Sequence, residues 1–195
     1  LGRLDQAISL YRQARAADPL NQRVLDSLSG ALETAGLLQE AEQVERHLYA
    51  LNPDYFAIHS TLSWLLLRQG NAEQALAELE SETDDFWGGL NRQLCLFSLG
   101  RHAEADAALA SLIESYQHMG AYQIAGSYGW RNQPDEAFKW LEIAYQQHDP
   151  GMSSLLKDHT LRSLHDDPRW ESLLEKIGLL DAWKEMPARY KGHSQ

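Results

Sequence analysis

The chain has 195 residues, 44% of them hydrophobic, which is enough to bury a continuous core. Its formal net charge of −11 argues against binding to nucleic acid, because phosphate backbones are neutralised by clustered lysine and arginine. The longest stretch without a formal charge, 115–130, is too short and too polar to span a membrane.

A repeated spacing organises the chain. A turn residue recurs at intervals of 34, 34, 30 and 32 residues, at Gly2, Gly36, Gly70, Gly100 and Asn132. An alanine follows each of them five residues later, at Ala7, Ala41, Ala75, Ala105 and Ala137. A period in this range predicts stacked structural units, each built from a helix, a turn and a second helix.

Residues 1–21 contain only the second half of such a unit. Ile8, Tyr11 and Ala14 lie at helical core spacing within 3–17, and no first helix precedes them. We expect one side of this helix to pack on the next unit and the other to stay exposed or to meet a second copy of the chain, forming a homodimer. Because the chain starts in mid-repeat without methionine, we also expect it to be a fragment of a longer protein.

The unit 22–55 is the best formed. One apolar stripe runs through Leu25, Leu28 and Leu32, and a second through Leu38, Ala41, Val44, Leu48 and Leu51. Gly36 lies where the first helix must stop, since glycine tolerates left-handed geometry, and Pro53 prevents the second helix from continuing. The small side chain of Ala41 is expected where the two helices cross.

Three further units are predicted at 56–85, 86–117 and 118–150. The first of them ends in an acidic stretch, which we expect to be a solvated helix end; a docking patch for a basic partner or a cation is the alternative. In the second, Cys95 lies in an apolar run and is expected in the core. It is the single cysteine, which favours a reducing compartment, so we expect a cytoplasmic protein. In the third, Asn132 takes the place of the turn glycine, and Pro134 opens the following helix.

Residues 151–195 depart from the repeat and are expected to form short helices. Asp167 before Pro168 predicts a helix start, and Gly178 predicts a stop. Several leucines and Trp183 give this segment an apolar face. Terminal units of repeat arrays must cover an otherwise exposed face, so the segment is predicted to be a C-terminal helical cap on the array 1–150.

No arrangement of residues in the sequence predicts catalysis or a cofactor. The eight histidines include no pair with metal-ligand spacing, and Asp167, close to His165, is expected to cap a helix. No nucleophile motif surrounds Ser153, and the glycines of 120–129 lack the preceding strand of a nucleotide-binding loop. We therefore expect no metal, no cofactor and no enzyme activity.

The period, the turn glycine, the crossing alanine and the closing proline together resemble a tetratricopeptide repeat of 34 residues. In the unit 22–55 the turn glycine is Gly36, the crossing alanine is Ala41 and the closing proline is Pro53, and Leu28 matches the leucine of the first helix. The hallmark tryptophan, glycine and tyrosine of the first helix are not matched. The resemblance covers about four and a half units and implies an all-α fold, a right-handed superhelical solenoid. The end of the chain is similar to the end of tetratricopeptide arrays in bacterial signalling proteins, including winged-helix transcription regulators and nucleotide-cyclase-like proteins.

The resemblance implies that the first helix of each unit lines a concave groove. It places these residues there: Arg23, Asp26, Ser60, Trp64, Leu67, Arg68, Leu94, Phe97, Tyr122 and Trp130. Trp64 and Leu67 are expected to bury apolar side chains of a partner, and Arg68 to pair with an acidic group or a terminal carboxylate. Repeats that hold chaperone C-termini use lysine and asparagine at positions occupied here by Asp26 and Gly30, so a carboxylate clamp is not expected.

These observations predict a scaffold for protein–protein interaction that binds a peptide or protein in its groove. The alternative is a regulatory or ligand-sensing module of a multidomain signalling protein, and an enzyme is the third candidate. An upstream DNA-binding or cyclase domain would favour the module, and strongly perturbed pKa values in a closed pocket would favour the enzyme.

Overall fold

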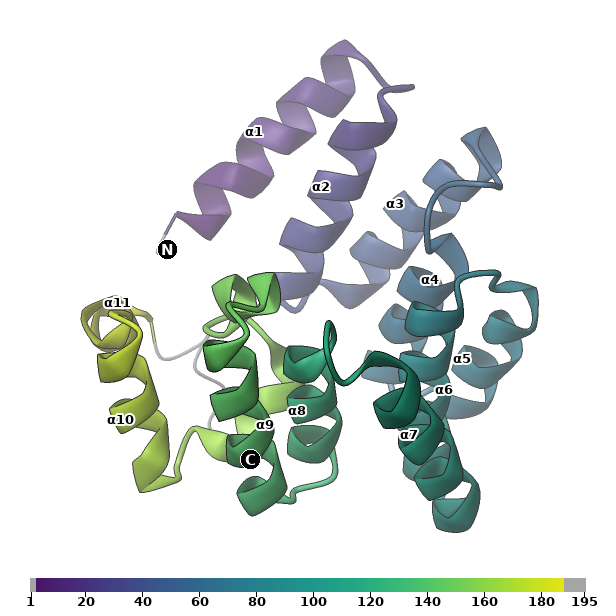
Figure 1. Cartoon of the computed structure of the whole chain (residues 1–195). Helices are drawn as coiled ribbons and strands as arrows, with labels where there is room; N and C mark the ends of the chain where they lie inside the picture. The colour runs from purple at the N-terminus through teal and green to yellow at the C-terminus, as the bar shows by residue number, and fades with distance from the viewer. Residues whose placement is uncertain (1–2, 188–195) are drawn as a thin grey trace. The chain divides into compact units, whose positions relative to one another are not determined.

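The computed structural model describes residues 3–187, and the regular elements in that range are helices packed in antiparallel pairs (Figure 1). The described chain forms two compact units, named here the N-terminal unit (3–108) and the C-terminal unit (109–187). The boundary between them falls inside one helix, α7 (His102–Tyr116). The predicted all-α fold is confirmed.

The N-terminal unit starts with a lone helix and continues with helix pairs (Figure 1). Its elements before α7 are α1 (Leu4–Ala17), α2 (Gln22–Thr34), α3 (Leu38–Leu51), α4 (Ile58–Arg68), α5 (Ala72–Glu78), the 3₁₀ turn η1 (Leu79–Ser81) and α6 (Asp85–Ser98). Helix α3 packs on both α2 and α4, and α5 packs on both α4 and α6. Each second helix of a repeat therefore lies between two first helices, as the repeat pattern predicts.

The C-terminal unit contains one helix pair followed by short helices. Its elements after α7 are α8 (Ala121–Trp130), α9 (Pro134–Gln146), the 3₁₀ helices η2 (Pro150–Ser154) and η3 (His159–Leu164), α10 (Pro168–Lys176) and α11 (Leu180–Glu185). The predicted start and stop of α10 are confirmed: Asp167 accepts a hydrogen bond from the Arg169 amide, and Gly178 has a φ of 75°. Whether 151–195 acts as a cap on a continuous array stays a prediction.

The turn positions adopt the left-handed geometry that the repeat pattern predicts. Gly36, Gly70, Gly100 and Asn132 have φ values of 78°, 83°, 73° and 54°. At each of them the next amide bonds back to the carbonyl five residues earlier, as from Leu37 to Leu32 at 2.9 Å. This pattern satisfies carbonyls that the helix end would otherwise leave unpaired. The first position of the series, Gly2, lies outside the described residues.

The crossing alanines are buried. Ala41, Ala75, Ala105 and Ala137 have no exposed surface, which confirms the burial expected for Ala41. A larger side chain at these points would push the two helix backbones apart. The core of the first complete repeat contains most of the two predicted stripes, with Leu25, Leu28, Leu32, Val44 and Leu48 fully buried. Leu51 at the end of α3 is 36% exposed, so its predicted place in the second stripe is wrong.

Helix α1 packs on α2 on one side only. Ile8 is 4% exposed, whereas Leu10 is 64% exposed and lies on the same helix. This asymmetry agrees with the prediction of a second helix whose partner is not among the described residues. Association of two copies through the open side stays a prediction.

The glycines of α8 allow a close approach by η3. A side chain at Gly129 would place its Cβ 2.5 Å from the carbonyl oxygen of Thr160, and one at Gly126 would lie 2.5 Å from the hydroxyl of the same residue. The scattered glycines of this segment therefore have a packing role. Across the described range, no helix is both long enough and apolar enough to cross a bilayer.

Candidate functional site

The structure divides the ten predicted groove residues between the surface and the core of their units. Arg23 and Asp26 on α2 are exposed. Trp64, Arg68, Phe97 and Trp130 have intermediate exposure. The remaining four, Ser60, Leu67, Leu94 and Tyr122, are at most 4% exposed. The surface formed by the first helices α2, α4 and α6 of the N-terminal unit, named here the first-helix surface, keeps only part of the predicted set.

The four buried residues correct the sequence-based expectation. Leu67 faces the interior because α4 is contacted by α3, α5 and α6, which leaves it little free surface. Leu94 on α6 is 2% exposed. Tyr122 is fixed within the C-terminal unit, where its hydroxyl donates to Asp158 at 2.8 Å and its amide donates to Asp149 at 3.0 Å. These side chains pack inside their units and offer no surface to a partner.

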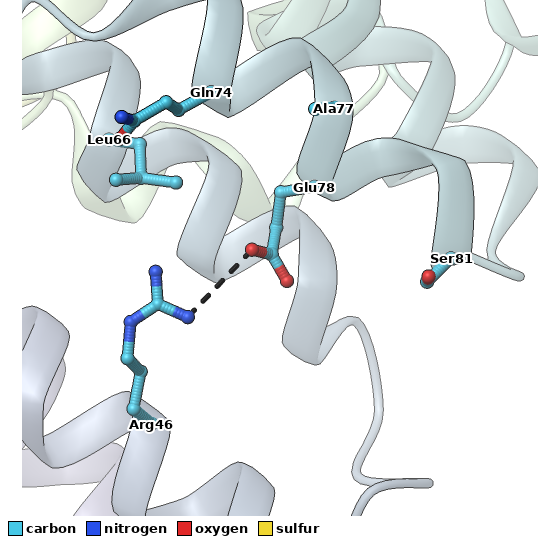
Figure 2. Close-up of a pocket in the computed structure, with 6 residues that line it drawn as sticks. All are labelled: Arg46, Leu66, Gln74, Ala77, Glu78 and Ser81. Atoms are coloured by element: carbon cyan, nitrogen blue, oxygen red, sulfur yellow. Dashed lines mark ion pairs between the residues drawn. The ribbon is translucent and has the colours of Figure 1, made fainter.

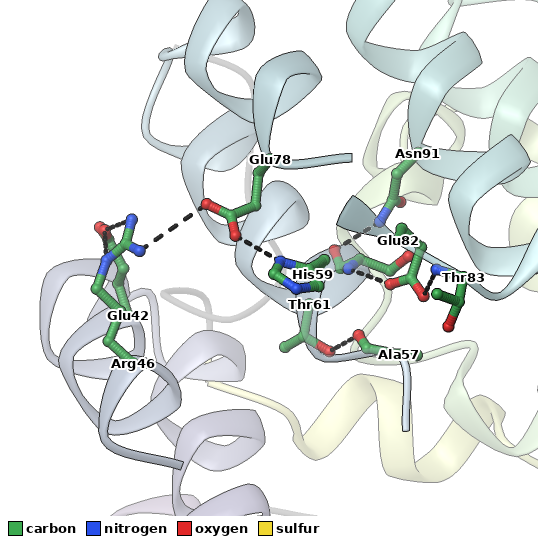
Figure 3. Close-up of polar contacts among 10 residues, drawn as sticks. Glu42, Arg46, Ala57, His59, Thr61, Glu78, Glu82, Thr83 and Asn91 are labelled. Carbon is green, nitrogen blue, oxygen red and sulfur yellow. Dashed lines mark hydrogen bonds and ion pairs between the residues drawn. The ribbon is translucent and has the colours of Figure 1, made fainter. Parts of the chain in front are cut away.

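Ser60 is the fourth buried residue, and its backbone amide and carbonyl link α4 to the side chains of Glu82 and Asn91. Its amide donates to Oε2 of Glu82 at 2.7 Å, and its carbonyl accepts from Nδ2 of Asn91 at 2.6 Å (Figure 3). The Glu82 carboxylate also accepts from the amides of Thr83 and Asp84 at 2.9 Å each. Burial by itself would raise the pKa of Glu82, but these amide hydrogen bonds hold it below its ordinary value.

The Arg68 guanidinium is already paired inside the chain. It forms an ion pair with Glu33 of the preceding repeat, and its side chain is only 5% exposed. The Trp64 indole donates from Nε1 to the same carboxylate at 3.2 Å, and the guanidinium carbon lies 5.4 Å from the centre of the Trp64 rings. The expectation that Arg68 would pair with an acidic group of a partner is therefore corrected: Glu33 takes that place.

Two further acids lie on neighbouring helices, Asp26 on α2 and Glu45 on α3. Asp26 is exposed, whereas Glu45 is 1% exposed and its Oε2 atom has no hydrogen-bond partner among the described residues. Burial raises the pKa of Glu45 to about 7, contact with the Ser29 hydroxyl lowers it, and the charge of Asp26 raises it. Although the residue as a whole is exposed, the neighbouring protein partly removes water from the Asp26 carboxylate, which raises its pKa. These two residues are named here the carboxylate pair.

Tyr55 lies within the electrostatic range of the carboxylate pair. Burial raises the pKa of its hydroxyl, the charges of Asp26 and Glu45 raise it further, and Arg23 acts in the opposite direction. Sequence reasoning named Arg23 and Asp26 but missed Glu45. The available signal was its position four residues after Ala41 and three before Leu48, where an acid interrupts an apolar stripe.

The predicted acidic stretch has local structural roles. Glu78 accepts from Nδ1 of His59 at 2.8 Å and lies 3.9 Å from a guanidinium nitrogen of Arg46 (Figure 3). Arg46 in turn pairs with Glu42 at 2.8 Å. Asp84 caps α6 by accepting from the Trp87 amide at 2.8 Å. A free docking patch of acids, the alternative raised from the sequence, is therefore not what these contacts support.

A hollow of about 390 Å³ lies beside this network (Figure 2). Its lining residues are Arg46, Leu66, Gln74, Ala77, Glu78 and Ser81. Three of them belong to α5, and α3, α4 and η1 supply one each. None of the ten predicted groove residues is among them. The C-terminal unit contains a hollow of about 470 Å³ near Tyr145 and Lys176. There Lys176 pairs with Glu142 at 2.7 Å and lies 4.3 Å from the Tyr145 ring centre.

The metal-ligating side chains and the cysteine of residues 3–187 were expected to form no site. No three histidine, cysteine or acidic side chains gather there in a way that would hold a metal ion. Cys95 is fully buried as predicted, and burial raises the pKa of its thiol to about 11. A thiol in that state is neutral at physiological pH and is a poor nucleophile.

Comparisons with known proteins agree with the fold. No protein-family model matches the chain. The curated human protein O-mannosyl-transferase TMTC1 is 24% identical over 186 residues, which is 92% of this chain but 19% of that protein. The chain thus spans about a fifth of the length of this relative.

Two solved structures resemble the chain. The crystal structure of MamA matches with a TM-score of 0.54 and 21% identity, over 75% of this chain and 90% of that one. A TPR protein with an unusual peptide-binding site, YrrB, matches with a TM-score of 0.47 and 18% identity, over 78% and 82%. Together with the helix pairs, turn geometry and crossing alanines, the first likeness confirms the tetratricopeptide-repeat fold.

Proposed function

We propose that the chain binds a protein or peptide partner on the first-helix surface of its N-terminal unit. The tetratricopeptide-repeat fold is typically a scaffold for protein–protein interaction, and this is the general basis of the proposal. The fold alone does not specify the partner, which is selected by the side chains of the binding surface.

The observation that carries the proposal is the rigid support of Trp64. Its side chain is half-buried on α4, its indole nitrogen is bonded to Glu33, and the Arg68 guanidinium lies 5.4 Å from its ring centre. Binding energy in interfaces concentrates in a few tryptophan, tyrosine and arginine anchors. An aromatic side chain that is already held in place loses little conformational entropy when a partner covers it.

The exposed charges of α2 supply the polar part of the same surface. Arg23 and Asp26 are exposed one helical turn apart, and Glu33, which holds Trp64, lies on the same helix. A surface of this kind suits a partner segment that combines an apolar anchor with charged groups. In this arrangement Arg68 is a positioning residue that holds Glu33 and Trp64.

The test begins with capture of partners by the full chain. The affinity of the captured protein is then measured by titration calorimetry for the wild type and for Trp64→Ala. The proposal requires at least a tenfold loss of affinity with helical content unchanged. Normal binding by a folded Trp64→Ala would contradict it.

A second candidate is a regulatory or sensing module within a larger protein. The observation that favours it is the match to only 19% of the human relative, over nearly the whole of this chain. Deletion of the module from a longer protein that contains it should then change the activity of the remainder without abolishing its folding. The transferase activity in the relative's name is not part of the proposal, because the chain matches only 19% of that protein at 24% identity.

A further inference from the structure

The hollow of about 470 Å³ in the C-terminal unit is named here the C-terminal hollow, and it is separate from the first-helix surface. Its walls are the end of α9, the 3₁₀ helix η2, and the end of α10 with the segment that leads to α11. Its apolar lining residues are Tyr145, Met152, Ile177 and Leu179, and all four are partly exposed. A concave surface with an accessible apolar lining suits an apolar side chain of a partner.

Among the residues that line the C-terminal hollow, the accessible charge belongs to a cation. Lys176 and His148 are both exposed, whereas the lining acid Asp149 is only 7% exposed. The Asp149 carboxylate accepts from the amides of Tyr122 at 3.0 Å and Gly151 at 2.8 Å, so backbone donors already stabilise its charge. A group that enters the hollow therefore meets the ammonium and imidazole groups, and this favours an anion.

The ammonium group of Lys176 is positioned at the hollow without being buried. It donates to both carboxylate oxygens of Glu142, at 2.7 and 2.8 Å, and lies 4.3 Å from the centre of the Tyr145 ring. The side chains of Lys176 and Glu142 are 41% and 44% exposed, so water screens this ion pair and it contributes little to stability. Within residues 3–187 the two bonds to Glu142 leave the third donor of the ammonium group for an incoming acceptor.

His148 has a backbone conformation that a histidine adopts only at some cost. It follows α9 with a φ of 55°, in the left-handed region that glycine occupies freely. Its amide donates to the Tyr145 carbonyl at 3.1 Å, and the next amide donates to the Ala144 carbonyl at 2.9 Å, so the turn fixes its position. Such a residue beside a hollow indicates a use for its side chain, and an imidazole can donate to an anion in either protonation state.

We propose that the C-terminal hollow binds a partner segment in which an apolar side chain stands beside a side-chain carboxylate. The apolar side chain packs on the apolar lining, and the carboxylate accepts from Lys176 and His148. The carboxylate competes with Glu142 for the ammonium group, and the exchange costs little because the existing ion pair is exposed. This inference goes beyond the proposed function, because it concerns the other unit and does not require the first-helix surface.

The methionines provide a direct readout of binding. The chain has three, Met119, Met152 and Met186, and Met152 lines the hollow. Met119 is 73% exposed and is not among the lining residues, so it reports unspecific binding. Isotopically labelled methionine methyl groups of the full chain are followed by NMR during titration with acetyl-leucyl-glutamate methylamide, named here the glutamate peptide. We expect a saturable shift of the Met152 signal and an unchanged Met119 signal.

Control peptides separate the two parts of the ligand. Glutamine in place of glutamate, or alanine in place of leucine, should each weaken binding about tenfold, and lysine in place of glutamate should abolish the saturable shift. Acetyl-leucine, which carries a free terminal carboxylate, tests a chain terminus as the source of the anion. The proposal is overturned by equal affinity of the glutamate and glutamine peptides, by tighter binding of acetyl-leucine, or by a Met152 signal that does not shift.

The two partners of the Lys176–Glu142 ion pair should give effects of opposite sign. Lys176→Gln should weaken binding of the glutamate peptide about tenfold and leave the glutamine peptide unaffected. Glu142→Gln removes the competing carboxylate and should strengthen binding of the glutamate peptide about threefold. Lys139→Gln, which breaks an exposed ion pair with Glu136 on the same helix, is the matched control and should have no effect. Weaker binding in both Lys176→Gln and Glu142→Gln would mean that the pair only shapes the surface, and the proposal would fail.

His148→Gly separates binding from stability. Glycine adopts a φ of 55° without strain, so the melting temperature should not fall below that of the wild type. The same variant should bind the glutamate peptide about threefold more weakly, because one donor to the carboxylate is lost. Circular dichroism confirms that each variant is folded. Wild-type affinity in His148→Gly would contradict the site as proposed.

Discussion

The indole nitrogen of Trp64 donates a hydrogen bond to Oε1 of Glu33 at 3.2 Å, and so joins the first helices of two successive repeats. The same carboxylate holds the Arg68 guanidinium, whose side chain is 5% exposed. One acid thus fixes both an aromatic and a cationic side chain on the neighbouring helix. The position of Trp64 on the first-helix surface depends on this contact.

Replacing Glu33 with alanine should destabilise the N-terminal unit. The change leaves the mostly buried charge of Arg68 without its partner, and we expect a loss of about 2 kcal/mol in the free energy of unfolding. Urea denaturation measures it. The matched control is Glu40→Ala, which breaks an exposed ion pair with Arg12 and should cost less than about 1 kcal/mol. Equal losses for the two variants would contradict the role assigned to Glu33.

The crossing alanines provide a test of the repeat register. Ala75→Leu should overpack the contact between α4 and α5 and lower the free energy of unfolding by about 1–3 kcal/mol. Ala77→Leu makes the same change two residues away at an exposed position and should be nearly neutral. Melting temperatures of the two variants give the comparison. A melting temperature of Ala75→Leu equal to that of the wild type would show that the register is wrong.

The glycines of α8 should differ from a glycine in open space. Gly129→Ala brings a Cβ against the backbone of Thr160, so we expect a loss of about 1–3 kcal/mol. Gly30→Ala on α2 meets no atom within 4 Å and should stabilise the chain by about 0.5–1 kcal/mol, because alanine favours a helix. Thermal unfolding of both variants tests this, and a destabilising Gly30→Ala beside a neutral Gly129→Ala would refute it.

Glu45 makes stability depend on pH in a direction opposite to most acids. Its pKa is raised from 4.5 to about 7 by folding, so the folded state binds more protons in that interval. Its stabilising contribution is complete below pH 4.5 and is lost as the pH rises to about 7, a change of about 3 kcal/mol. The neutral Glu45→Gln lacks this loss, so relative to the wild type it should gain about that amount between pH 4 and pH 8. Urea denaturation at both pH values tests it; a constant difference would contradict the prediction.

The fold could be predicted from the sequence because local rules determine it. Turn geometry at Gly36 and Asn132 and burial at Ala41 and Ala75 follow from residue type and a fixed period. These features depend on backbone conformation and side-chain volume. Both properties follow from residue type in the sequence, whichever helices pack against each other.

The candidate site was predicted less well because it depends on contacts between repeats. The repeat position of Arg68 suggested a free cation, but Glu33, thirty-five residues earlier, neutralises it. Leu67 was expected at the surface, but α4 is covered by helices on several sides. The burial of Glu45 is not predicted by the repeat pattern, because Glu45 lies in a second helix and the pattern assigns only first-helix positions to the groove.

The central claim is that Trp64 anchors a partner on the first-helix surface. The most direct measurement is the affinity of the captured partner for Trp64→Ala, determined by titration calorimetry beside circular dichroism. Phe56→Ala, which removes an aromatic side chain that is 70% exposed in the loop before α4, is the matched control. The account predicts at least a tenfold weaker partner with unchanged helicity for Trp64→Ala, and normal affinity for Phe56→Ala. Normal affinity in a folded Trp64→Ala, or unfolding of that variant with Trp64→Phe folded and binding normally, would contradict it.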